Sequence, residues 1–260
     1  MLYFIGLGLW DDKDITLKGL EAARKCDKLY AEFYTSKMGV EIEKIEKTIG
    51  KKISILSREE IENGSKLLEE AMKKDVCLLT GGDPMTATTH IELRIRAKEM
   101  GIETRIVHGT SIVSASASFL GLQIYKFGRI TSLVKPSKNY FPLSPYDVIK
   151  NNLKMGWHSL VLLDIFNGCM TANDGIKILM EMESRRKEGI ISSNTLIAVV
   201  ARISSNDAFA KAGYLKDMIK MDFGKTPHSI IIPGKMHFME AKALVKLANA
   251  PEEIMKIKKD

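Results

Sequence analysis

The chain has only three cysteines, Cys26, Cys77 and Cys169, and they lie far apart in the sequence. No CxxC pair and no Cys/His cluster occurs, so we expect no structural zinc site and no other metal site. The apolar N-terminus lacks the basic region of a signal peptide, and an odd number of cysteines without such a signal indicates a reducing, cytoplasmic compartment. No apolar run approaches the roughly 18 residues that span a bilayer, so we expect no membrane partner.

Several motifs that mark common enzyme classes are also missing. The sequence contains no HExxH, no GxSxG and no GxxxxGK[ST], which argues against zinc protease, serine hydrolase and P-loop NTPase functions. A GxG pair follows the first apolar run in "IGLGLWDD", but Asp11 stands where the GxGxxG fingerprint needs its third glycine. A carboxylate there would repel a pyrophosphate, so a dinucleotide site is not favoured.

What the chain does have is the composition of a globular α/β protein. Its 260 residues are 45% hydrophobic and 27% charged, which suits two domains or one large one. The formal net charge is +7. A basic surface can attract nucleic acid, but a solvated lysine-rich surface is the commoner explanation, and we expect no nucleic-acid partner.

Apolar runs of strand length alternate with segments of helical periodicity along the whole chain. Predicted strands cover 2–9, 28–34, 52–56, 75–80, 102–109, 129–135, 158–165, 195–204 and 228–234. Predicted helices cover 14–27, 41–50, 58–74, 90–101, 110–121, 146–156, 172–189, 211–224 and 237–250. This order predicts two α/β domains, 1–113 and 114–260, with largely parallel pairing in the first.

Glycines and small polar residues follow the predicted strands of the first domain. In "LLTGGDPMTATTH", Gly81 and Gly82 let the chain turn tightly and bring its backbone close to a ligand. Asp83 either caps the amides that follow or faces a cationic ligand, and the local pattern favours the cap. Ligands of open α/β sheets bind outside the carboxyl ends of the strands, so these turns are candidate binding loops.

Three such strand exits in this order resemble the tetrapyrrole methylase superfamily. They are "FIGLGLWDDKDITLKGLEAARKCD", "LLTGGDPMTATTH" and "IVHGTSIVSASASFLGL", and the later strands fall where that family has its own. The resemblance covers nearly the whole chain. It implies two α/β domains of the tetrapyrrole methylase type, with an S-adenosylmethionine site in the cleft between them. The glycine-proline-glycine phrase usual in tetrapyrrole enzymes is replaced here by "GLGLWDD".

The resemblance also implies which positions meet S-adenosylmethionine. Carried over residue by residue, the cofactor contacts would be Leu9, Asp83, Thr86, Ser111, Ile112, Leu163, Ile203 and His228. An acid at the second exit suits a cofactor that carries an ammonium and a sulfonium group. The apolar members of this set suit an adenine ring.

The phrases "GDPMTATTHIELRIRAK", "MTAND" and "DFGKTPHSIIIPGKMH" are most similar to one branch of the superfamily. That branch implies an archaeal, homodimeric enzyme that methylates the amino group of an aminocarboxypropyl-modified histidine on elongation factor 2. A tetrapyrrole methyltransferase and a ribosomal RNA methyltransferase of the same fold are the alternatives. No catalytic residue is assigned. His90 and Asp164 are candidates for substrate contact. The alternatives are that His90 lies on the surface of a helix and that Asp164 stabilises the turn at the end of a strand.

Overall fold

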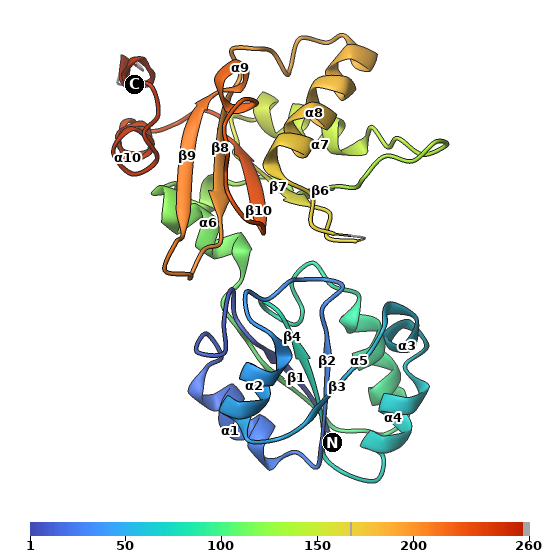
Figure 1. Cartoon of the computed structure of the whole chain (residues 1–260). Coiled ribbons are helices and arrows are strands. Elements are labelled where there is room, and N and C mark those ends of the chain that lie inside the picture. The colour runs from blue at the N-terminus through green and yellow to red at the C-terminus, as the bar shows by residue number, and fades with distance from the viewer. Residues whose placement is uncertain (167, 257–260) are drawn as a thin grey trace. The chain divides into compact units, whose positions relative to one another are not determined.

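A computed structural model describes residues 1–166 and 168–256 and divides the chain into two compact units (Figure 1). The first unit is Met1–Ile112 together with the short segment Ser204–Asn206. The second is Val113–Ile203 together with the chain from Asp207 onward. The sequence predicted a boundary after residue 113 and placed all of 114–260 in the second domain.

The first unit is built on a five-stranded sheet of order β3-β2-β4-β1-β5, in which every pairing is parallel. Its strands are β1 (Leu2–Gly6), β2 (Lys28–Glu32), β3 (Ile53–Ile55), β4 (Val76–Thr80) and β5 (Thr104–Val107). Strand β4 is buried along its whole length, as its unbroken apolar run predicts. The predicted parallel pairing of this half of the chain is confirmed.

Helices cover both faces of this sheet (Figure 1). They are α1 (Leu17–Lys25), α2 (Ile42–Ile49), α3 (Arg58–Asn63), α4 (Ser65–Ala71) and α5 (His90–Glu99). The first two pack in one apolar cluster and the other three in the second. The prediction of one helix over 58–74 is wrong, because Gly64 takes φ +68° and separates α3 from α4.

The second unit contains a mixed five-stranded sheet of order β6-β7-β10-β8-β9. Its strands are β6 (Thr131–Leu133), β7 (Ser159–Leu163), β8 (Leu196–Ala201), β9 (Phe209–Tyr214) and β10 (His228–Ile232). Only the β6–β7 pair is parallel, and β10 runs antiparallel to both β7 and β8. Strand β10 therefore begins beside the residues at which β7 and β8 end.

The second unit also contains helical segments. They are α6 (Ile112–Leu120), which begins at the last residue of the first unit, η1 (Ile124–Lys126), α7 (Ser144–Lys154), α8 (Ala172–Arg186), α9 (Leu215–Met218), α10 (Phe238–Ala248) and η2 (Glu252–Lys256). Of these, α7, α8 and α9 contribute to one apolar cluster with the sheet. The predicted helix over 211–224 is wrong. Residues 209–214 form β9 instead, because all six of its residues pair with β8, and only Leu215–Met218 is helical.

Candidate cofactor site

The glycine-bearing exits of β1, β4 and β5 meet backbone to backbone in the first unit. A Cβ on Gly6 would lie 2.5 Å from the carbonyl oxygen of Gly82 and 2.6 Å from the amide nitrogen of Gly109. A Cβ on Gly109 would lie 2.3 Å from the same Gly82 oxygen. No side chain fits at Gly6 or Gly109 without moving backbone, so these glycines are what allows the three exits to pack together.

Two hydrogen bonds tie the first exit to the second. The Gly8 N–H donates to the Gly82 carbonyl at 3.2 Å, and the Gly82 N–H donates to the Gly8 carbonyl at 2.6 Å. Both glycines have positive φ, +79° and +75°. Asp14 secures the next residues, because its Oδ2 accepts the N–H groups of Leu9 at 3.2 Å and Trp10 at 2.7 Å. The predicted position Leu9 is thus held in a fixed turn beside the second exit.

Asp83 is buried, and both of its carboxylate oxygens have partners. Oδ1 accepts the Met85 N–H at 3.0 Å and the Thr86 hydroxyl at 3.1 Å, while Oδ2 lies 2.7 Å from Nδ1 of His108. Burial raises the pKa of Asp83, but the Met85, His108 and Thr86 contacts outweigh it and leave the pKa below its ordinary value. Asp83 is therefore a fixed anion that caps its own turn, as the local pattern favoured.

The third exit contributes Ser111, which is half-buried, and Ile112, which opens helix α6. Together with Leu9, Asp83 and Thr86, these residues follow β1, β4 and β5, which are adjacent in the sheet. Each of the three strands is parallel to its neighbour, so the five predicted positions gather at the carboxyl ends of these strands. Open α/β sheets bind ligands just outside these carboxyl ends.

His90 is not the helix-surface residue that one interpretation of the sequence allowed. It is the first residue of α5 and its side chain is completely buried. One ring nitrogen bonds the Pro84 carbonyl, and the other faces the buried carboxylate of Glu32 at the end of β2. The imidazole has no exposed surface in this structure, which argues against the candidate role of His90 as a direct substrate contact.

The predicted residues of the second unit lie at one end of its three central strands, β7, β10 and β8. Leu163 is the last residue of β7, Ile203 follows β8, and His228 begins β10. In the antiparallel register His228 stands opposite Ala201, and its neighbour Ser229 stands opposite Leu162. The sequence alone did not indicate that β10 runs against β7 and β8, and this reversal is what brings His228 to the other two.

The imidazole of His228 is occupied by the fold itself. Its Nδ1 accepts the N–H of Ala172 at 3.1 Å, so Nε2 carries the proton and donates to the Lys225 carbonyl at 3.0 Å. Burial lowers the pKa of His228, and the ring is neutral with both nitrogens bonded. This histidine joins the start of α8 to the segment before β10.

Sequence reasoning missed three charged or titratable side chains that support these edges. Glu32 and His108 have been described, and the third is Arg202, which is buried at the exit of β8. Its Nε donates to Asp207 at 2.7 Å and its Nη1 to the Phe223 carbonyl at 2.9 Å. The three residues share one sequence feature that could have identified them, because each is the last residue of a strand or directly follows one.

Asp164 was the other candidate for substrate contact. Its Oδ2 accepts the Lys135 N–H at 3.0 Å and its Oδ1 the Phe166 N–H at 2.9 Å. Its backbone carbonyl also accepts the Met170 N–H at 2.7 Å. Asp164 thus organises the loop that follows β7, which matches the turn-acid alternative.

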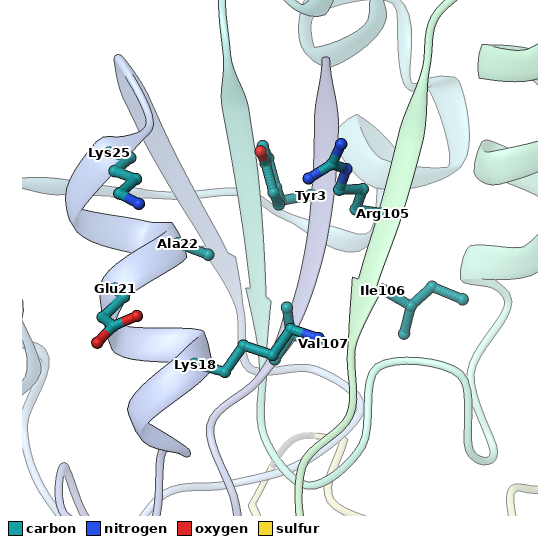
Figure 2. Close-up of a pocket in the computed structure, with 8 residues that line it drawn as sticks. All are labelled: Tyr3, Lys18, Glu21, Ala22, Lys25, Arg105, Ile106 and Val107. Carbon is teal, nitrogen blue, oxygen red and sulfur yellow. The ribbon is translucent and has the colours of Figure 1, made fainter.

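A pocket lies on another part of the first unit, between α1 and the edge strand β5 (Figure 2). Its lining residues are Tyr3, Lys18, Glu21, Ala22, Lys25, Arg105, Ile106 and Val107. None of the predicted cofactor contacts is among them. In the described part of the chain, no group of three or more His, Cys, Asp or Glu side chains could hold a metal ion, and no helix could cross a membrane.

The two groups of strand-end residues described above lie in a chain whose sequence matches a known family. A family model described as tetrapyrrole (corrin/porphyrin) methylases matches residues 1–218. The chain belongs to the tetrapyrrole methylase family. The family match agrees with the two α/β units and with the resemblance carried by the three strand exits.

Relatives within the tetrapyrrole methylase family are similar to this chain over nearly its whole length. A diphthine synthase of Methanocaldococcus jannaschii is 54% identical over 251 residues, which cover 94% of this chain and 97% of that protein. A diphthine synthase of Methanosarcina mazei is 49% identical over 263 residues, which cover 98% of each. A crystal structure of a diphthine synthase superposes with a TM-score of 0.91 at 37% identity and covers 99% of both chains.

Proposed function

We propose that this methylase acts as a diphthine synthase and transfers methyl groups from S-adenosylmethionine to a modified histidine of elongation factor 2. The observation that carries the proposal is the 54% identity to a diphthine synthase across 94% of this chain and 97% of that protein. The amino group of the aminocarboxypropyl histidine would be the acceptor. The proposal includes a cytoplasmic homodimer with no membrane or nucleic-acid partner.

The first unit offers groups that fit S-adenosylmethionine. Asp83 is an ionised carboxylate held by the β4 exit; Oδ1 already accepts two hydrogen bonds, and Oδ2, which contacts only His108, has a lone pair for a further donor. An ammonium group is such a donor, and charge-assisted hydrogen bonds are stronger than neutral ones. No phosphate has to be cradled, which explains why an acid can stand where a dinucleotide site needs glycine. Leu9, Thr86, Ser111 and Ile112 complete the proposed contacts of this unit.

The second unit would contribute Leu163, Ile203 and His228. The two aliphatic side chains suit the adenine ring, because small-molecule sites are lined mostly by apolar groups. Both ring nitrogens of His228 are already bonded, so its contact with the cofactor would come from its backbone or ring face. The imidazole would act by holding the start of β10 in place.

When bound, S-adenosylmethionine supplies an activated methyl group, so the difficult chemistry belongs to the cofactor. The residues of the chain would orient the acceptor amine and the methyl group for direct displacement, and such positioning is worth roughly 7–11 kcal/mol in favourable cases. An α-amino group has a pKa of about 7.7–8.0, so a neutral fraction is present near neutral pH. We therefore assign no general base.

Incubation of the protein with S-adenosylmethionine carrying a labelled methyl group tests the proposal. We expect label in elongation factor 2 that bears the aminocarboxypropyl histidine and none in the unmodified factor, because only the former has the acceptor amine. A uroporphyrinogen-type tetrapyrrole and naked ribosomal RNA serve as competing substrates. Comparable labelling of either would refute the assignment and favour one of the other methyltransferase classes of this fold.

A further inference from the structure

Glu32 and His90 form a buried pair that joins two strand exits of the first unit. Glu32 ends β2 and His90 opens α5, and both side chains are completely buried. The distance between Nε2 of His90 and Oε1 of Glu32 is 3.5 Å. That separation is longer than the roughly 2.7–2.9 Å of a charge-assisted hydrogen bond, so the two groups face each other without forming one.

The His90 imidazole holds the loop that follows β4. Its Nδ1 lies 2.9 Å from the Pro84 carbonyl oxygen, which only accepts hydrogen bonds, so Nδ1 is the donor. The Thr88 hydroxyl donates to the same oxygen at 2.8 Å. The imidazole also stacks on Phe4 of β1, with ring centroids 6.5 Å apart. Pro84 follows Asp83 directly, so these contacts fix the backbone next to the carboxylate.

Glu32 holds the exit of β2 in the same way. Its Oε2 accepts the N–H groups of Tyr34 and Thr35, each at 3.1 Å, and its Oε1 accepts the Thr35 hydroxyl. The two exits are in contact, since a Cβ on Gly81 would lie 2.9 Å from the Cβ of Ser36.

The protonation state of the His90 ring supports its role in holding the loop. Burial lowers the pKa of His90, while the nearby Glu32 carboxylate acts in the opposite direction and does not overcome it. The ring is then neutral at physiological pH, with its one proton on Nδ1 directed at Pro84. Besides Glu32, the groups that contact the ring are the aromatic ring of Phe4 and the Pro84 carbonyl.

We propose that His90 is a positioning residue that fixes the Asp83–Thr86 turn for binding S-adenosylmethionine. The inference rests on the proposed function, because it assumes that this turn meets the cofactor. His90 touches neither cofactor nor substrate and acts through the Pro84 carbonyl. The consequence is that cofactor affinity depends on a hydrogen bond buried beneath the binding loop.

His90→Phe removes the donor to Pro84 and keeps an aromatic ring that can stack on Phe4. We expect the dissociation constant of S-adenosylmethionine, measured by titration calorimetry, to rise about three- to tenfold, the usual effect of one buried hydrogen bond. The KM for the cofactor should rise in parallel, with kcat at saturating cofactor nearly unchanged. His90→Asn places an amide N–H near the position of Nδ1 and should restore most of the affinity. Thr88→Val, which removes the hydroxyl that donates to Pro84 and accepts the His90 backbone N–H at 3.5 Å, gives a second variant of the same loop should His90→Phe fail to fold.

Tyr30→Phe is the matched control. It removes the partly buried hydrogen bond from the Tyr30 hydroxyl to Glu70, 2.9 Å long, on the same face of the same sheet. We expect it to lower the melting temperature of the free protein and leave cofactor affinity unchanged. The same pattern in His90→Phe and Thr88→Val would overturn the positioning role while the proposed function stands. If the unaltered protein itself bound no S-adenosylmethionine, the proposed function would fail and this inference with it.

Discussion

Replacing Asp83 with asparagine separates the charge of this side chain from its capping role. The asparagine oxygen can still accept the Met85 N–H and the Thr86 hydroxyl, which Asp83 accepts at 3.0 and 3.1 Å. The loss is confined to the contact with Nδ1 of His108, whose side chain is 72% exposed, and exposed contacts of this kind contribute about 0–1 kcal/mol. The free energy of unfolding without cofactor should therefore fall by at most about 1 kcal/mol.

Cofactor affinity should respond far more strongly to Asp83→Asn. If the carboxylate receives the cofactor's ammonium group, removing its charge costs about 1.5–3 kcal/mol, or roughly 10- to 150-fold in the dissociation constant. Titration calorimetry should be run with both S-adenosylmethionine and S-adenosylhomocysteine, because the product keeps the ammonium and lacks the sulfonium charge. Equal losses for both ligands would place the ammonium at Asp83, and a loss for S-adenosylmethionine alone would place the sulfonium there.

Asp83→Ala supplies the comparison, since it removes the cap as well as the charge. We expect it to lower the stability of the cofactor-free protein by about 1 kcal/mol, the usual cost of losing such a cap. Cofactor affinity unchanged in Asp83→Asn would refute the charge-recognition reasoning. Asp83 would then be a cap alone, and the methylase assignment would be unaffected.

Three further outcomes are expected. Burial raises the pKa of Glu240, but Lys126 and its other hydrogen-bond donors outweigh it and hold the pKa at about 2 instead of 4.5. The second unit should therefore lose about 3 kcal/mol of stability as the pH falls from about 4.5 toward 2, and acid titration of Glu240→Gln should lack this loss. Gly109→Ala should lower the melting temperature and weaken cofactor binding, because its Cβ would lie 2.3 Å from the Gly82 carbonyl oxygen; an unchanged melting curve would contradict the close packing of the exits. S-adenosylmethionine should raise the melting temperature and NAD should not, and equal shifts would revive a dinucleotide site.

Much of the first unit follows from local pattern. Strands β1 and β4 are apolar runs that end at Gly6 and Thr80, and Gly50 ends helix α2 with φ +84°. Thr16 caps α1, while Asp14 secures the preceding turn. The second unit was harder to predict, because β9 carries lysine and glycine and is a strand only through its pairing with β8. Tertiary pairing overrode local propensity there.

The site shows the same division between local and long-range information. The cap at Asp83 could be predicted, since its partners Met85 and Thr86 lie two and three residues away. The partner at His108 could not, because it is 25 residues distant and is brought near only by the pairing of β4 and β5 with opposite sides of β1. His90 was placed wrongly for a similar reason, since nothing local indicates that Glu32 and Pro84 enclose it.

The most direct test of the account is to locate the transferred methyl group. Elongation factor 2 bearing the aminocarboxypropyl histidine would be incubated with the protein and S-adenosylmethionine, digested, and the histidine peptide fragmented in a mass spectrometer. We predict methyl groups on the amino nitrogen of that side chain, and none on the peptide when the factor lacks the modification. Methylation at a different residue, or an unmodified peptide after full incubation with folded, cofactor-bound protein, would contradict it.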